Sequence, residues 1–189
     1  MSNFDVNYDK GCFVEDFISE YVDEMFGWKF VAGARRGEMH NISEIERLFS
    51  CRYIAPIAKK KGPSLDFLDG EEPVIMPDIL FRSKKDWLFW VESKSSFDSR
   101  FYSVDIPEEK IRAYTKIQMN TKSPVWIIVS LVDGDYCEIY SARINDINKL
   151  INSGRLISFY NKSYKKECYT LNVKTSLFVS LSDGKIKMN

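Results

Sequence analysis

The sequence has 189 residues, of which 44% are hydrophobic and 29% charged, a composition typical of one soluble globular domain with its own core. The 27 basic and 27 acidic residues give no net charge, so nothing global indicates a polyanionic partner, and any nucleic-acid binding must be local. No apolar run is long enough to cross a bilayer, and the start MSNFDVNYDK lacks the layout of a secretion signal, so we expect a cytoplasmic protein without membrane contacts.

The N-terminal part of the sequence predicts helix, strand and helix. Residues 11–26 have the strongest helical periodicity of the chain, with two adjacent apolar columns at four-residue spacing that would dock on a sheet. Residues 28–38 indicate a short strand that runs into a loop. A second helix is expected at 41–49, where Ser43 and Glu46 resemble a capping box.

The middle of the sequence predicts a β-hairpin followed by a helix. Residues 62–73 are rich in turn formers and predict a mobile loop. The apolar runs 74–81 and 87–94 are separated by a short polar segment, which is typical of a hairpin. Asp105 is expected to cap a helix over 106–121.

The C-terminal half predicts mostly strands. Residues 124–132 form a continuous apolar run with many β-branched residues, which suits a strand buried on both faces. A turn leads to a strand at 137–142 and a short helix at 144–152. Residues 169–188 alternate polar and apolar side chains and indicate further β-structure.

Several residues are expected to pack rather than to act. We interpret the four scattered cysteines as buried small hydrophobes, because they form neither a CxxC pair nor a disulfide framework. The aromatic residues of the second hairpin strand alternate and are expected in the core, not as base-stacking platforms. These two sets are Cys12, Cys51, Cys137 and Cys168, and Trp87, Phe89 and Trp90.

Three charged residues of the hairpin form the candidate site. Glu92 and Lys94 point the same way on their strand, where they interrupt an otherwise apolar run. Folding the hairpin places Asp78 opposite Trp90 or Glu92, so the two carboxylates become direct or diagonal neighbours. Converging carboxylates suit Mg²⁺ or Mn²⁺, and the only histidine, His40, argues against a histidine-rich metal site.

The spacing of these residues resembles a known signature. Pro77-Asp78, thirteen residues and then Glu92-Ser93-Lys94 are similar to the motif of the PD-(D/E)xK nuclease superfamily, which includes restriction enzymes, archaeal Holliday-junction resolvases and phage nucleases. The resemblance implies a restriction-endonuclease-like α/β fold with a mixed central sheet flanked by helices. It implies that Asp78, Glu92 and the Ser93 carbonyl bind Mg²⁺ or Mn²⁺, and that Lys94 positions water or stabilises the transition state.

A glutamate on a preceding helix completes the resemblance. Lys10-Gly11-x-x-x-Glu15 is similar to the KGxxxE start of the junction resolvases, which makes Glu15 a further catalytic residue and metal ligand. Glu15 borders the apolar stripe of its helix and can reach the seam with the sheet. Glu24 also borders the stripe and is a weaker alternative, and a carboxylate favoured by the helix dipole is the simpler interpretation of Glu15.

Substrate contacts are assigned to two groups of residues. On the helix after the motif, Lys110, Tyr114 and Gln118 recur at four-residue spacing, so one face could reach the site, although packing explains the tyrosine equally well. Short basic clusters in expected loops could contact phosphates, although a solvated loop is their ordinary role. These clusters are Lys59, Lys60 and Lys61, Arg35 and Arg36, and Lys84 and Lys85.

Together these features predict one nuclease-like domain over 1–189, with an insertion at about 32–72 and a β-rich C-terminal extension. The expected activity is metal-dependent hydrolysis of phosphodiester bonds in nucleic acid, with DNA as the favoured partner. Junction and duplex cutters are often dimers, so a homodimer is possible. The alternatives are an inactive member of the fold that binds nucleic acid or protein, and an interaction protein in which these charges form a structural salt bridge.

Overall fold

The protein is described here by a computed structural model that covers residues 3–35, 38–56, 62–68, 72–97 and 102–188, with side chains from residue 13 onward. Within these ranges, no helix combines the length and apolar character needed to span a membrane.

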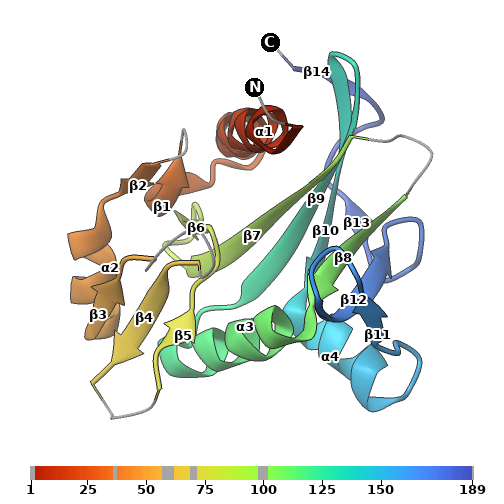
Figure 1. Cartoon of the computed structure of the whole chain (residues 1–189). Helices are drawn as coiled ribbons and strands as arrows, with labels where there is room; N and C mark the ends of the chain where they lie inside the picture. The colour runs from red at the N-terminus through yellow and green to blue at the C-terminus, as the bar shows by residue number, and fades with distance from the viewer. Residues whose placement is uncertain (1–2, 36–37, 57–61, 69–71, 98–101, 189) are drawn as a thin grey trace.

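A mixed central sheet forms the middle layer of the molecule (Figure 1). Strand β7 pairs in parallel with β9, and the other pairings in this sheet are antiparallel. The parallel pair requires a long crossover, which helix α3 provides. In spatial order the strands are β13 (Val179–Ser180), β10 (Tyr136–Arg143), β9 (Val125–Asp133), β7 (Leu88–Ser96), β6 (Ile79–Arg82), β1 (Lys29–Arg35) and β2 (Glu38–His40), with β14 (Ile186–Lys187) also paired to β10.

Helices cover both faces of this sheet (Figure 1). Helix α1 (Asn3–Phe26) lies on one face, and α3 (Glu108–Thr121) and α4 (Ile144–Asn152) lie on the other. The expected α/β fold with a mixed central sheet flanked by helices is therefore confirmed. Helix α1 begins earlier than the periodicity predicted and ends where Gly27 adopts a positive φ of 64°.

Two smaller sheets complete the fold. The first consists of β3 (Cys51–Ile54), β4 (Ser64–Phe67) and β5 (Val74–Ile75), and it lies beside α2 (Ile42–Phe49). The second consists of β11 (Phe159–Asn161), β12 (Lys166–Asn172) and β8 (Ser103–Pro107). The prediction of a loop over 62–73 was wrong for β4, because pairing with a distant strand outweighs the local turn propensity.

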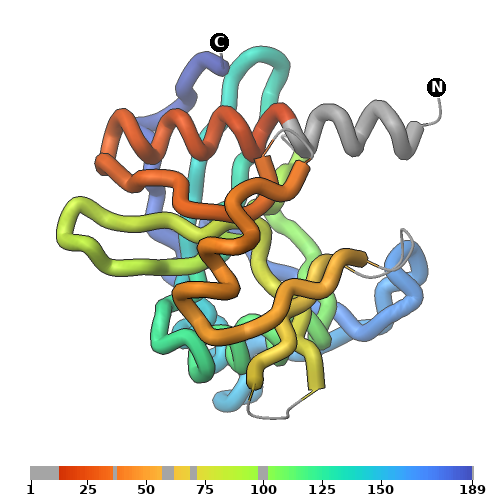
Figure 2. Tube along the Cα trace, turned by 90° about the vertical axis from the view of Figure 1, so that its left-hand side faces the viewer, coloured from red at the N-terminus to blue at the C-terminus, as the bar shows by residue number. Residues whose placement is uncertain are grey.

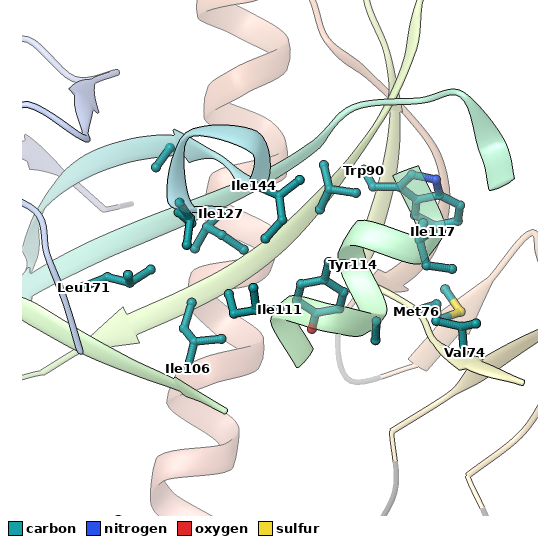
Figure 3. Packing of buried hydrophobic residues seen from close by; sticks show 14 of the residues in the cluster. Val74, Met76, Trp90, Ile106, Ile111, Tyr114, Ile117, Ile127, Ile144 and Leu171 are labelled. Carbon is teal, nitrogen blue, oxygen red and sulfur yellow. The ribbon is translucent and has the colours of Figure 1, made fainter. Parts of the chain in front are cut away.

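The core has two parts, one on each face of the central sheet. On the α1 face, Val14, Ile18 and Val22 pack against β6, β7 and β10. On the α3 face, side chains from α3, α4 and the smaller sheets pack on Trp90 and Ile127, as Figure 3 shows. Strand β9 is buried on both faces, as its continuous apolar run predicted.

Two predicted helix caps were wrong. The Ser43–Glu46 capping box does not form, because the residue before α2 is Asn41, which has a positive φ of 54° and donates from Nδ2 to the Val31 carbonyl at 2.9 Å. Asp105 does not cap a helix, because it lies in β8, where its carboxylate accepts hydrogen bonds from Asn161 and Thr170. Strand β8 therefore continues to Pro107, and α3 begins at Glu108.

The packing predictions were confirmed with one exception. Cys51, Cys137 and Cys168 are free and buried, whereas the side chain of Cys12 lies outside the described residues. Phe89 and Trp90 are buried, but Trp87 is 70% exposed. Trp87 precedes β7 in the turn of the β6–β7 hairpin, which projects from the rest of the chain in Figure 2, so strand alternation does not govern it.

Candidate active site

The β6–β7 hairpin brings Asp78 and Glu92 together. Paired residues in this hairpin have numbers that sum to 170, as in Ile79 with Val91. Continuing this register by one residue places Asp78 opposite Glu92, one of the two partners that the sequence left open. The Ser93 amide donates a 2.8 Å hydrogen bond to Oδ2 of Asp78, which holds the aspartate against β7. The register therefore fixes the two carboxylates on one side of neighbouring strands.

A glycine on β1 allows Asp78 to sit where it does. Gly33 has a φ of 120°, and a Cβ at this position would lie 2.3 Å from the Asp78 carbonyl oxygen. The next amide, that of Ala34, donates a 2.7 Å hydrogen bond to the same oxygen. Any side chain at residue 33 would push β1 away from Asp78. The sequence gave no signal for this contact.

Glu92 is fully buried and ionised. Lys94 and Lys110 each place Nζ 2.7 Å from Oε1, and the Tyr114 hydroxyl donates a short hydrogen bond to Oε2. Burial opposes ionisation of this carboxyl, but Lys110 and then Lys94 outweigh it and lower the pKa of Glu92 to about 2. The carboxylate is thus held on both oxygens by groups from two elements, β7 and α3.

The two lysines connect this buried carboxylate to the surface. The side chains of Lys94 and Lys110 are 25% and 26% exposed, whereas that of Glu92 is 0% exposed. Burial lowers the pKa of Lys94, but attraction to Glu92 and then to Asp78 outweighs it, so the pKa is raised and the ammonium stays charged. Parts of both lysine side chains therefore reach the surface, although the carboxylate that they hold does not.

Glu15 and Asp78 lose a proton less readily than Glu92 does, because their pKa values are raised. Burial, followed by repulsion from Asp78 and Glu92, raises the pKa of Glu15 to about 8. Burial, followed by repulsion from Glu92, raises the pKa of Asp78 to about 6. Glu15 lies on α1, so the helix brings a third carboxylate into the electrostatic range of the hairpin pair. Glu24, the weaker alternative on this helix, is exposed.

The carboxylates of Glu15, Asp78 and Glu92 are ligands of the type that a hard divalent cation prefers. Three carboxylates repel each other beside two ammonium groups, and carboxylate oxygens are the ligands that Mg²⁺ and Mn²⁺ prefer. In the described ranges, no three His, Cys, Asp or Glu side chains are grouped closely enough to form a ready metal cluster. Oε1 of Glu92 is occupied by both lysines, so a metal would have to replace an ammonium group there.

Helix α3 contributes Lys110 and Tyr114 to the site, but not Gln118. Lys110 and Tyr114 reach Glu92, as their four-residue spacing allowed, and Figure 3 shows the Tyr114 ring among apolar side chains. Gln118 instead donates to Asn145 at 2.7 Å and accepts from the Val125 amide. The sequence assigned no role at the centre of the site to Lys110, although the spacing was visible.

The basic clusters do not gather at the site within the described residues. Arg35 lies 3.6 Å from Asp16 and 3.6 Å from Glu20, both on α1. Lys84 and Lys85 are exposed in the β6–β7 turn, at the end of the hairpin away from Asp78. Arg36 and the triplet Lys59, Lys60 and Lys61 lie outside the described residues, so their assignment as substrate contacts stays a prediction.

Comparisons with known proteins give little further information. No protein-family model and no curated protein matches the sequence. Among solved structures, the chain is similar to Hjc, a Holliday junction resolvase from Archaeoglobus fulgidus, with 7% sequence identity and a TM-score of 0.39 over 74% of this chain and 84% of that chain. A TM-score this low assigns neither a family nor an activity.

Proposed function

We propose that this protein is a metal-dependent nuclease of the PD-(D/E)xK type that hydrolyses phosphodiester bonds of nucleic acid, with DNA as the first candidate. The observation that carries the proposal is the meeting of Asp78, directly before β6, and Glu92 on the paired strand β7, with the Lys94 ammonium 2.7 Å from the Glu92 carboxylate. The mixed central sheet flanked by helices, with an antiparallel hairpin followed by a helix and a parallel strand, agrees with the fold that the sequence resemblance implied. We further propose that residues 1–189 form one nuclease-like domain, in which residues at about 32–72 are an insertion and the C-terminal β-structure is an extension.

The proposed reaction is the addition of water to the phosphorus atom and cleavage of one phosphorus–oxygen ester bond. Asp78, Glu92, the Ser93 carbonyl and Glu15 would hold a divalent ion, which when bound supplies an acidified water and charge neutralisation. Lys94 donates to a phosphate oxygen and stabilises its growing negative charge. Lys110 and Tyr114 keep the Glu92 carboxylate in place during the reaction.

The direct test is a cleavage assay with single-stranded, duplex and branched DNA and RNA in Mg²⁺, Mn²⁺ or EDTA. Asp78→Asn, Glu92→Gln and Lys94→Met should each abolish metal-dependent cleavage. Asp66→Asn is the matched control for the aspartate, because Asp66 is also partly buried and paired with a basic residue. Undiminished cleavage by the Asp78→Asn protein would contradict the proposal.

A structural role for the charges is the second candidate, and one observation favours it. Both oxygens of the buried Glu92 already have protein partners, as expected for a salt-bridge network in an inactive nuclease fold that binds nucleic acid or protein. Calorimetric titration with Mn²⁺ separates the two functions. Saturable binding that is lost in Asp78→Asn supports the nuclease, whereas no binding together with a stability loss in Glu92→Gln supports the structural role.

A further inference from the structure

The hairpin formed by β11 and β12 is attached to the element that carries part of the candidate site. Strand β12 pairs with β8 over five residues, from Cys168 with Pro107 to Asn172 with Ser103. Strand β8 continues directly into α3, the helix that places Lys110 on Glu92. An ion pair between Lys166 and Glu109 adds a second link between the hairpin and this helix.

The tip of this hairpin has a defined shape. Oδ1 of Asn161 accepts hydrogen bonds from the amides of Ser163 and Tyr164, at 2.9 and 3.1 Å. Nδ2 of the same residue donates to Asp105 on β8 at 2.8 Å. One side chain therefore closes the turn and fixes it to the sheet, which lowers the entropy cost of binding a partner there.

The tip exposes aromatic and basic side chains together. Tyr160 is 59% exposed and Tyr164 is 51% exposed. Lys162 and Lys165 are also exposed, and neither forms an ion pair with a described residue. Tyr160 lies opposite Glu167, on the face of the hairpin that carries Tyr169 and Leu171 into the core, so the tip extends beyond the packed part of that face. Such rings contribute nothing to the core and remain available to a ligand.

The tip also lies near the candidate site. Lys166, the first residue after the tip, pairs with Glu109, and the next residue of α3, Lys110, donates to Glu92. A strand that contacts the tip therefore lies beside the part of α3 that holds the candidate site.

We propose that the tip of this hairpin, residues 160–165, binds an unpaired strand of nucleic acid beside the candidate site. The inference rests on the proposed nuclease function and narrows its substrate to nucleic acid with unpaired nucleotides. Tyrosine rings stack on base faces, which a duplex does not expose because its bases stack on each other. The lysines contact the backbone phosphates on either side.

Fluorescence anisotropy in EDTA tests the inference without requiring cleavage. The probes are a labelled 20-nucleotide single strand and its duplex. The double variant Tyr160→Ala/Tyr164→Ala should bind the single strand about ten-fold more weakly or worse, with duplex binding changed by less than about two-fold. Tyr160→Phe/Tyr164→Phe should bind like wild type, because it keeps both rings. Tyr136→Ala is the matched control, since Tyr136 is 47% exposed at the start of β10.

A salt titration with the same probes tests the lysines. Lys162→Gln/Lys165→Gln should reduce the slope of log affinity against log salt for the single strand by about 1.4, the value for two lost phosphate contacts. Equal losses for single strand and duplex, or losses no larger than those of Tyr136→Ala, would overturn the inference. If the protein cleaves nucleic acid but the tip variants show these equal or small losses, only the proposed role of the tip is wrong. If the protein does not cleave but single-strand binding depends on the two tyrosines, only the proposed nuclease activity is wrong.

Discussion

The two faces of the central sheet are built from the same strands but differ in what they bury. On the α1 face, β6 and β7 contribute Phe81, Phe89 and Val91, which pack with Ile18 in an apolar layer. On the α3 face, Trp90 is apolar and packed, but the next residue on that side is the buried Glu92. Strand β7 therefore contributes to an apolar core on one face and to a charged site on the other.

The difference shows what a charged residue in a sheet requires. A buried carboxylate is costly unless other groups hold it. Helix α3 meets this requirement with Lys110 and Tyr114, and β7 adds Lys94 two residues along the same face. Helix α1 offers the other face mainly apolar side chains and contributes Glu15 at its border. A change within the apolar α1 face should therefore alter stability alone, whereas a change at the charged groups of the α3 face should also alter activity.

The largest expected effect is a loss of stability from a change on the α1 face. Ile139→Ala removes a fully buried side chain on β10 and should lower the free energy of unfolding by roughly 2–5 kcal/mol. Urea unfolding followed by circular dichroism measures this change. Cleavage per folded molecule should stay at the wild-type level, and a selective loss of cleavage would show that the two faces are not independent.

A change at the charged groups of the α3 face should reduce cleavage strongly and stability only slightly. Lys94→Met keeps an unbranched apolar side chain but removes the ammonium group beside Glu92, so cleavage should fall by roughly 10²–10³-fold. The melting temperature should change by only a few degrees, because Lys110 and Tyr114 still hold Glu92. Lys174→Met is the matched control, since Lys174 also pairs with a carboxylate, that of Glu138. Equal cleavage by both variants would argue against a catalytic Lys94.

The hairpin and its carboxylate pair could be predicted from the sequence because they depend on local rules. A short polar separator set the register, and strand alternation put Glu92 and Lys94 on one side. The helix partners depended on tertiary contacts. Strand β8 extends to Pro107 because it pairs with β12, and this pairing sets where α3 begins and which face Lys110 takes.

The small sheet and the conformation at Gly33 could not be predicted for the same reason. Strand β4 forms by pairing with β3 across a sequence full of turn residues, so local propensity gave the wrong answer. Gly33 permits the close approach of β1 to the Asp78 backbone, which no local pattern indicated. Both features follow from contacts between segments far apart in the chain.

A smaller effect should distinguish the hydroxyl groups on the two faces. Tyr114→Phe removes the donor to the charged Glu92 and should destabilise the protein by about 1.5–3 kcal/mol. Tyr21→Phe is the matched variant on α1, where the hydroxyl donates to the neutral Leu181 carbonyl at 3.1 Å, and it should cost about 0.5–1.5 kcal/mol. Chemical unfolding of the two variants compares them directly. A Tyr114→Phe cost below that of Tyr21→Phe would mean that Glu92 does not depend on this hydroxyl.

The smallest effect should appear as a pH dependence at the border between the faces. The pKa of Glu15 is raised from 4.5 to about 8, so the folded protein holds this proton more tightly than the unfolded chain does. The resulting stability is present below pH 4.5 and is lost as the pH rises through about 8. In EDTA, Glu15→Gln should therefore melt like wild type at pH 5 and a few degrees higher at pH 8. Added Mn²⁺ should raise the wild-type melting temperature at pH 8 more than that of the variant, because the ion favours the ionised carboxylate. If wild type and Glu15→Gln differ in melting temperature by the same amount at pH 5 and pH 8, Glu15 ionises as in the unfolded chain and does not interact with Asp78 and Glu92.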